Sequence, residues 1–253
     1  MTLKIPYFSI VTCCYNSADF IKQTLNSVDL QSFHNYEHIL VDGCSDDDTL
    51  EIIKSTNNCF RTYISEKDDG MYHAINKGIA RAKGKYILIL NSDDMLLDSE
   101  VLEKIYQSTR HHDFSAFYCH LHKIRLGRMR ERKLFQVDFQ DLLNSRHSTF
   151  CPHPGLFVRN DIYRQLDFYD LEYKYASDLD FILRLLRKHT VKYLGFSSTI
   201  FRQHSGSITG RGLLSFERDQ IILNHNDGYM PRQGFKYYML WSWYVLKNLL
   251  NYR

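Results

Sequence analysis

The hydrophobic pattern of the first part of the chain switches repeatedly between two periods. Short apolar runs rich in β-branched residues predict strands at residues 7–13, 36–41, 60–64 and 86–90. Apolar positions three or four apart predict helices between them, at residues 17–31, 46–56 and 71–82. Because strands that alternate with helices form parallel sheets with covered faces, we predict an α/β fold.

The second part of the chain is less regular. It holds strand-like segments at 115–121, 155–158 and 191–201, a helical turn at 161–166 and a clear helix at 177–188. Basic and apolar residues alternate around Gly127, which predicts a hairpin over residues 123–133. From residue 213 onward the pattern is helical. We therefore expect one domain, with a loop and helical extension after it: 1–205 (halves 1–95 and 96–205) and 206–253.

Polar residues follow each of the first four predicted strands. They are Asn16 after the first, Asp42 after the second, Glu66 and Asp68 after the third, and Asp93 and Asp94 after the fourth. Parallel sheets bind ligands beyond the carboxyl ends of their strands. We therefore expect these side chains to line one crevice.

Composition adds constraints on partners and location. The net charge of +3 is too small to indicate nucleic acid as a partner. The six cysteines form no C-x-x-C pair, which favours free thiols in a reducing compartment. No apolar signal stretch opens the chain, and the longest nearly apolar run, residues 237–246, is shorter than the ~20 residues of a membrane span. We expect a cytoplasmic protein.

The sequence Asn91-Ser92-Asp93-Asp94 is the sharpest local signal of chemistry. Adjacent carboxylates repel one another unless a positive group lies beside them. Mg²⁺ and Mn²⁺ prefer oxygen ligands of this kind and share them with substrate phosphates, so a divalent metal site is the first interpretation. The alternative is a helix cap, in which Asp94 or Asp98 opens the helix that follows.

Two further segments have both a binding and a structural interpretation. Asp42, beside Gly43 at a strand end, can accept an N–H group of a ligand base or can belong to a common turn. Gly70 precedes a helix whose free N–H groups can face a phosphate. The alternative is an acidic loop that leads into an ordinary amphipathic helix.

Several sequence blocks occur in a recognisable order. They are SIVT at 9–12, YN at 15–16, VDGCSDDDT at 41–49 and SEKDDGMYHAINKGIARAKGKYILILNSDD at 65–94. Together they resemble the family 2 inverting glycosyltransferases, in particular small enzymes that build bacterial exopolysaccharide, capsule or O-antigen units. The resemblance covers roughly residues 5–205. It implies the GT-A fold, a Rossmann-like nucleotide-diphospho-sugar transferase fold with a mostly parallel central sheet, here with a helical C-terminal extension.

The resemblance also implies a role for each matching position. Around the nucleotide it implies Thr12 and Asn16 in the pocket, Asp42 on the base (uracil), Ser45 beside it, and Glu66 and Asp68 at the border with the sugar. Asn91 and Asp93 fill the first and third places of the Asp-x-Asp motif, so Asp93 is the expected ligand of Mn²⁺ or Mg²⁺. Asp94 is expected to contact the metal or the donor sugar. Many members have Asp where this chain has Asn91, and also where it has His73.

The catalytic base is expected in the second half of the chain. Inverting transfer needs a group that removes the proton of the acceptor hydroxyl as the anomeric carbon is attacked. The family pattern Glu-Asp-x-Asp corresponds to residues 177–180, so the resemblance implies Asp178 as the base, with Ser177 in place of Glu. Asp180 is the alternative base, and helix capping is the alternative role for Ser177 or Asp178.

Three basic residues in a Gly/Ser-rich loop, Arg202, His204 and Arg211, can neutralise the leaving diphosphate or can form a solvated surface loop. His153, between two prolines, is expected at the acceptor site, and a purely structural role is the alternative.

The tail, residues 234–253, mixes aromatic and basic side chains. A helix of this composition can lie on a membrane surface, pack on the catalytic domain, or join two copies of the chain. The basic stretch at 123–133 can likewise face anionic lipid or solvent. Peripheral contact with the inner face of the membrane would suit a lipid-linked acceptor.

We therefore predict an inverting, metal-dependent glycosyltransferase that moves a hexose or N-acetylhexosamine from a UDP-sugar to a saccharide or lipid-linked saccharide. A sugar nucleotidyltransferase is the alternative enzyme, although no Gly-rich basic loop follows the first strand. A catalytically inactive nucleotide-sugar-binding protein is the second alternative, because Asn91 and His73 depart from the family pattern.

Overall fold

The computed structural model describes residues 5–56, 58–144, 153–204 and 213–226. The predictions for Arg211 and for the tail beyond residue 226 lie outside this part of the chain, as do the side chains of residues 144 and 213–216.

The described strands form a single sheet in the order β3-β2-β1-β4-β8-β6-β9-β5, with β7 paired to β6. Their bounds are β1 Phe8–Cys14, β2 Tyr36–Asp42, β3 Arg61–Ser65, β4 Tyr86–Ile89, β5 Met95–Leu96, β6 Ala116–Arg125, β7 Arg128–Arg132, β8 Leu156–Arg159 and β9 Val191–Gln203. All four strands of the first half run parallel. The predicted α/β fold with a mostly parallel sheet is confirmed.

The strands of the second half extend this sheet from β4. Strand β8 pairs antiparallel with β4 and with β6, whereas β6 and β9 are parallel. The short β5 pairs antiparallel with β9, although in sequence it follows β4 directly. The carboxyl end of β9 is thereby placed beside the segment that follows β4.

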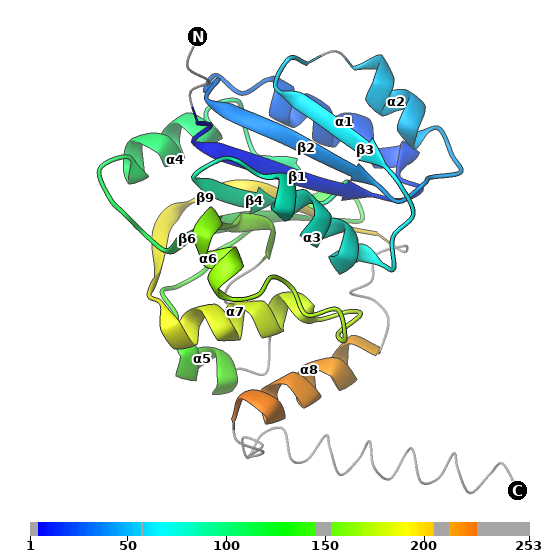
Figure 1. Ribbon diagram of the computed structural model, residues 1–253. Helices are drawn as coiled ribbons and strands as arrows, with labels where there is room; N and C mark the ends of the chain where they lie inside the picture. The colour runs from blue at the N-terminus through cyan, green and yellow to red at the C-terminus, as the bar shows by residue number, and fades with distance from the viewer. Residues whose placement is uncertain (1–4, 57, 145–152, 205–212, 227–253) are drawn as a thin grey trace, which may run out of the picture.

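Helices cover both faces of the sheet (Figure 1). Their bounds are α1 Ala18–Asp29, α2 Thr49–Ser55, α3 Met71–Arg81, α4 Val101–Thr109, α5 Phe139–Asn144, α6 Asn160–Gln165, α7 Ser177–Lys188 and α8 Leu213–His225. Neighbouring residues of β1 point to opposite faces, so Ile10 joins the core under α4 and Val11 joins the core under α3. Each face therefore has its own apolar layer.

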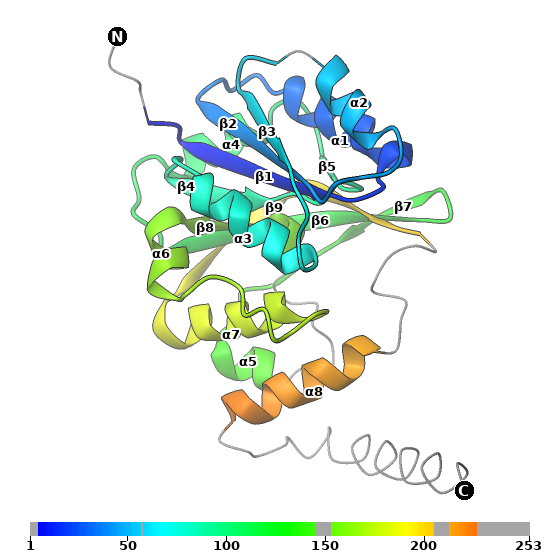
Figure 2. The same cartoon turned by 45° about the vertical axis from the view of Figure 1, so that its right-hand side comes forward.

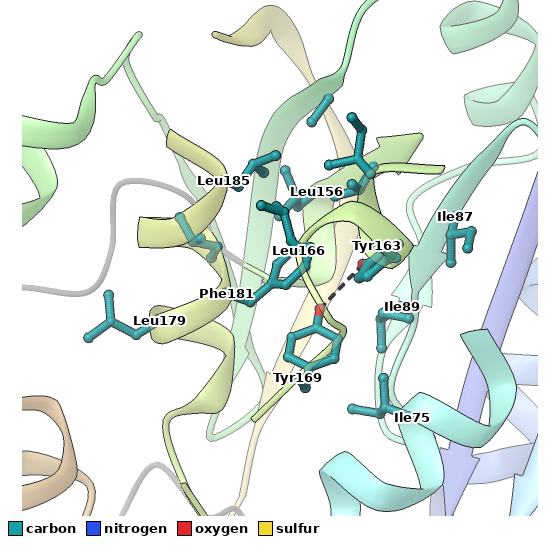
Figure 3. Packing of buried hydrophobic residues seen from close by; sticks show 14 of the residues in the cluster. Ile75, Ile87, Ile89, Leu156, Tyr163, Leu166, Tyr169, Leu179, Phe181 and Leu185 are labelled. Atoms are coloured by element: carbon teal, nitrogen blue, oxygen red, sulfur yellow. Dashed lines mark hydrogen bonds between the residues drawn. The ribbon is translucent and has the colours of Figure 1, made fainter. Parts of the chain in front are cut away.

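Helix α7 and helix α6 are joined by an aromatic cluster (Figure 3). Tyr163 and Tyr169 are buried, and their hydroxyl groups lie 3.3 Å apart. Phe181 of α7 stacks on Tyr163 with ring centroids 4.7 Å apart. This cluster fixes α7, which carries the predicted catalytic base, against the sheet.

The predicted and observed elements agree closely. The helix at 177–188 and the hairpin around Gly127 are confirmed. The helix expected at 46–56 begins only at Thr49, because the oxygens of Asp47 accept the N–H groups of Ala18 and Thr49 and hold the preceding loop. None of the helices between residues 5 and 226 that the structure describes is long and apolar enough to cross a membrane.

Candidate active site

Asp42 ends β2 and is fully buried. One carboxylate oxygen accepts the hydroxyl of Ser45 at 2.5 Å, and the other accepts the hydroxyl of Ser65 at 2.6 Å. Asp42 therefore ties the loop after β2 to the end of β3. A ligand N–H group would have to share oxygens that already have protein partners.

Asn16 and Ser45 join the ends of the first two strands. Asn16 has a φ of 48°, in the left-handed region that asparagine tolerates. Its side-chain oxygen accepts the N–H of Asp46 at 2.9 Å, and its own N–H donates to the hydroxyl oxygen of Ser45 at 2.9 Å. The two predicted nucleotide-binding residues thus lie in direct contact.

Thr12 lies inside the sheet and is fully buried. Its hydroxyl lies 3.1 Å from Nε2 of His38. Burial lowers the pKa of His38 to about 3, so this histidine is neutral and can pair with a hydroxyl. The side chain of Thr12 therefore gives no support to its predicted place in the nucleotide pocket.

The loop after β3 packs closely against the loop after β2. A Cβ atom on Gly43 would lie only 2.7 Å from a carboxylate oxygen of Asp68, so any other residue at position 43 would displace this side chain. The other oxygen of Asp68 accepts the N–H of Gly70 at 3.0 Å. Glu66 is exposed and forms an ion pair with Lys77 at 3.2 Å. Asp68 is thus the one of the two predicted residues that reaches the neighbouring strand end.

His73, which departs from the family pattern, has a local structural role. Its Nδ1 accepts the N–H of Asp69 at 3.0 Å, at the start of α3. The histidine therefore ties Asp69, the residue before the N-cap Gly70, to the first turn of this helix.

Asp93 and Asp94 meet different surroundings. Asp94 is fully buried, and its oxygens accept the backbone N–H of Arg202 at 3.0 Å and the side-chain amide of Asn91 at 3.3 Å. Burial and the negative charge of Asp93 raise the pKa of Asp94. Asp93 is partly exposed, and one of its oxygens lies 3.0 Å from Nε2 of His204. Asp94 therefore connects the segment after β4 to β9, and Asp93 is the carboxylate that a ligand can reach.

These residues fit a divalent metal only as a shared site. The described residues contain no group of three His, Cys, Asp or Glu side chains that could hold a metal by themselves. Mg²⁺ and Mn²⁺ sites that use one carboxylate and take further oxygens from substrate phosphates and water are common. Asp93 fits such a site, because its second oxygen has no partner among the described residues.

Arg202 and His204 reach the same place from β9. The guanidinium of Arg202 lies 4.9 Å from the ring centroid of Phe20 and donates to the side-chain oxygen of Gln23 at 2.6 Å. The ring of His204 also packs on Phe20, with ring centroids 4.6 Å apart. Phe20 therefore brings the two predicted diphosphate residues together, and His204 contacts Asp93.

Asp178 opens α7 and is partly exposed. Its Oδ1 accepts the N–H of Leu179 at 2.9 Å and the hydroxyl of Tyr72 at 3.0 Å. Its Oδ2 has no partner among the described residues. Burial and the charge of Asp178 raise the pKa of Tyr72, so this tyrosine stays protonated and remains a donor. One oxygen of Asp178 is thus held in place while the other is available to accept a proton.

Asp180, the alternative base, is fully engaged elsewhere. One of its oxygens pairs with Arg184 at 2.6 Å and the other lies 2.8 Å from Nε2 of His225. Burial alone would raise the pKa of Asp180, but the hydrogen bond to His225 and the charge of Arg184 outweigh it and lower the pKa. A carboxylate with this pKa and these partners is a poor proton acceptor.

His153 is buried in a layer of aromatic side chains. Its Nε2 is 2.7 Å from the hydroxyl of Tyr169, whose ring stacks on Tyr72 with centroids 5.5 Å apart. Burial lowers the pKa of His153, although the charge of Asp178 opposes the shift, and the histidine is neutral near pH 7. His153 is buried and supports the site through Tyr169.

Two residues that the sequence did not single out complete this region. Tyr72 belongs to the block at 65–94 and could have been found there, whereas Glu217 has no motif around it. The Glu217 carboxylate accepts the backbone N–H groups of Lys174, Tyr175 and Ala176 at 2.9, 2.7 and 3.0 Å. Helix α8 thereby fixes the turn that leads into Asp178.

A mostly parallel sheet with acidic and amide side chains at the carboxyl ends of its strands fits the class of nucleotide-sugar transferases with an α/β fold. Sequence comparison agrees, because residues 9–167 match the profile of glycosyl transferase family 2. The chain belongs to this family and is a glycosyltransferase.

Relatives and solved structures share this assignment. A PGL/p-HBAD biosynthesis glycosyltransferase of Mycobacterium tuberculosis is 30% identical over 189 residues, which cover 72% of this chain and 70% of that protein. TuaG of Bacillus subtilis, described as a teichuronic acid biosynthesis glycosyltransferase, is 37% identical over 97 residues, 37% of this chain and 38% of that protein.

Solved structures share the fold at lower sequence identity. S. aureus TarS in complex with UDP-GlcNAc superimposes with a TM-score of 0.70 at 20% identity, over 90% of this chain and 74% of that chain. A mannosyltransferase from Pyrobaculum calidifontis in complex with GDP-Man and Mn²⁺ gives a TM-score of 0.64 at 15% identity, over 92% of this chain and 68% of that chain. The expected GT-A fold is thus confirmed.

Proposed function

We propose that this glycosyltransferase moves a hexose or N-acetylhexosamine from a UDP-sugar to a saccharide hydroxyl with inversion, and that Asp178 is the base. The observation that carries the proposal is the geometry of the Asp178 carboxylate. Tyr72 and the N–H of Leu179 hold one oxygen, while the other has no partner among the described residues. A base held in this way can take the acceptor proton in a single displacement at the anomeric carbon.

The donor side of the proposed site consists of the joined strand ends. Asp42, Ser45, Asn16 and Asp68 form one network of loops after β1, β2 and β3. In the proposal this network binds the base and ribose. The relative that supports a UDP donor is S. aureus TarS, whose structure contains UDP-GlcNAc.

We further propose that Asp93 holds Mn²⁺ or Mg²⁺ together with the donor diphosphate. The metal would neutralise the charge that develops on the leaving diphosphate. His204, which contacts Asp93, and Arg202, which packs on the same phenylalanine as His204, would bind the phosphate oxygens. Because the protein supplies few ligands, we expect the metal to bind weakly without donor and firmly with it.

The acceptor is proposed to be a saccharide or a lipid-linked saccharide of a cell-surface polymer. The names of the relatives support this, since one acts in PGL/p-HBAD biosynthesis and another is described for teichuronic acid. A lipid-linked acceptor would require the enzyme to work at the membrane surface. Division of the chain into a donor half, 1–95, and an acceptor half, 96–205, belongs to the same proposal.

A thermal-shift screen tests the donor assignment. UDP-, GDP- and dTDP-sugars are added with Mn²⁺, Mg²⁺ or a chelator, and the unfolding temperature is recorded. A donor at 100 times its Kd stabilises the folded state by about 2.7 kcal/mol. Because the donor diphosphate is proposed to bind through the metal, the correct nucleotide should raise the unfolding temperature only when metal is present. A shift with GDP-sugars alone, or one that the chelator leaves unchanged, contradicts the UDP or the metal assignment. The anomeric configuration of the product, read by NMR, tests inversion.

A further inference from the structure

The hairpin of β6 and β7 carries its basic side chains on one face. In the register of the two strands, Lys123 lies opposite Arg130, Arg125 opposite Arg128, and Leu121 opposite Arg132. Directly opposite residues point to the same side, and every second residue of a strand does so as well. The five residues Lys123, Arg125, Arg128, Arg130 and Arg132 therefore share one face, which we call the basic face.

The described residues leave this charge without an ionic partner. None of the ion pairs between described residues includes a member of the basic face. The single acid of the hairpin, Glu131, lies opposite His122 on the other face and accepts the hydroxyl of Ser197. Burial and the charges of Arg132 and Arg125 lower the pKa of Lys123, which shows how closely the positive groups are placed. Like charges directly across a strand pair are destabilising, so the hairpin concentrates charge at a cost to its own stability.

The tip of the hairpin presents an apolar side chain in a disfavoured conformation. Leu126 has a φ of 50° and Gly127 a φ of 72°. Glycine and asparagine suit such a turn, whereas leucine is strained there. The side chain of Leu126 is 90% exposed, and Met129 is 53% exposed. Local folding alone gives no reason for leucine at this position.

The hairpin lies at the end of the sheet that carries the candidate active site. Arg125 pairs with Gln203, and Ile124 pairs with Arg202. Gln203 directly precedes His204, which contacts Asp93. Figure 2 shows the hairpin extending outward from the body of the molecule, past the neighbouring strands. A surface bound by this tip would therefore lie beside the carboxyl ends of the strands.

We propose that the β6–β7 hairpin docks the enzyme on an anionic lipid surface, with the basic face on the lipid headgroups and Leu126 inserted among them. Basic residues close to an anionic membrane each add attraction, and an exposed leucine gains by leaving water. An anionic soluble polymer would use the basic face but would give Leu126 no apolar partner. The lipid surface therefore explains both features. The proposal concerns binding alone and does not depend on the proposed transfer reaction.

Sedimentation of the full chain with vesicles tests the proposal. We expect binding to vesicles of phosphatidylcholine mixed with phosphatidylglycerol and little binding to phosphatidylcholine alone, with the former weakened by salt. Each basic residue removed should weaken binding about fivefold, so the double variant R128Q/R130Q should bind about 30-fold more weakly. Two exposed lysines outside the hairpin provide the matched control, Lys83 in the loop before β4 and Lys192 at the start of β9. The variant K83Q/K192Q should bind like the parent chain.

The variant L126N separates docking from folding. Asparagine tolerates a positive φ, so the hairpin should fold at least as well, while vesicle binding should fall roughly tenfold with the loss of the apolar tip. Thermal unfolding of both variants checks that the fold is intact.

Three results would overturn the proposal. One is equal vesicle binding by the parent, R128Q/R130Q and L126N chains, which would place any membrane contact elsewhere. Another is equal loss in K83Q/K192Q, which would reduce the effect to net charge. The third is binding of soluble polyphosphate by a parent chain that ignores anionic vesicles, which would make the basic face a site for a soluble polyanion.

Discussion

At the scale of single residues, the surroundings of a side chain distinguish aspartates that the sequence motifs do not. Asp93 and Asp94 are neighbours in one motif, yet only Asp93 has an oxygen without a partner among the described residues. Asp178 and Asp180 differ in the same way, because Asp180 is paired with Arg184 and His225. A pattern can place carboxylates near a site, but the packing around each one decides whether it can act.

Asp94→Asn should leave the protein at least as stable at neutral pH. An asparagine oxygen can accept the N–H of Arg202, and the substitution removes a charge that burial and Asp93 disfavour. Because the pKa of Asp94 is raised, the folded parent chain binds a proton at Asp94 as the pH falls. Protonation removes the buried charge, and with it the destabilisation that this charge causes. The gain in unfolding temperature should therefore shrink on acidification toward the ordinary aspartate range. A large drop in stability at neutral pH would show that the charge itself is needed.

Asp178→Asn should reduce transfer by about 10²–10⁴-fold, because the amide cannot take the acceptor proton. Donor binding in the thermal-shift assay should be unchanged, since Asp178 lies on α7 and not at the donor strand ends. Turnover with a saccharide acceptor is the measurement. Full turnover by this variant would remove Asp178 from the mechanism.

Asp180→Asn is the companion variant. Its loss should appear first in stability, by about 2–3 kcal/mol, because it leaves Arg184 without its ionic partner. If Asp180→Asn instead folds normally and abolishes turnover, the roles of the two aspartates are reversed.

At the scale of elements, α8 acts on the site through the backbone of its neighbour. Glu217 accepts the three consecutive N–H groups of residues 174–176, directly before α7. His225, near the other end of α8, contacts Asp180. The extension predicted after residue 205 thus includes a helix that shapes the catalytic one.

Glu217→Gln should therefore weaken both stability and transfer. The amide offers one acceptor oxygen for three donors and turns its own N–H groups toward them, at a cost of about 1–3 kcal/mol. Because the turn before Asp178 loosens, kcat should fall while the KM for the donor stays constant. Gln220→Ala, at an exposed position of the same helix, should leave stability and rates unchanged. Loss of stability with an unaltered kcat would limit Glu217 to a structural role.

The elements themselves could largely be predicted from the sequence, because strand and helix periodicities are local. The polar strand ends Asn16, Asp42 and Asp68 were found for the same reason, and the sheet brings them together. The pairing of Tyr72 with Asp178 joins positions 106 residues apart, and no local pattern encodes it. Thr12 shows a second limit of prediction from the sequence. Its position in a motif does not indicate that its hydroxyl faces His38.

At the scale of the whole molecule, the sheet interleaves the two halves of the chain. Strand β4 is covered on its outer edge by β8, and β5 pairs only with β9. The backbone N–H of Arg202 also donates a hydrogen bond to Asp94, which joins positions 108 residues apart. The two halves of the chain are therefore parts of one sheet and share their apolar layers.

A fragment that ends at residue 112 should consequently fail to fold, although it contains every predicted donor residue except Arg202 and His204. It would expose the edge of β4 and the apolar faces under α6 and α7. Circular dichroism and thermal melting should show no cooperative transition. A sharp transition in this fragment would mean that the first half forms an independent domain.

The position of β8 in the sheet also affects how the protein folds during its synthesis. Strand β4 is complete once residue 89 has left the ribosome and can pair with β1, yet its second partner, β8, begins only at Leu156. While residues 90–155 are being synthesised, one edge of the apolar strand β4 stays unpaired. Unpaired strand edges are surfaces through which nascent chains aggregate or recruit chaperones. Slow codons or pauses that lengthen this interval should lower the yield of active enzyme even though the finished protein is identical.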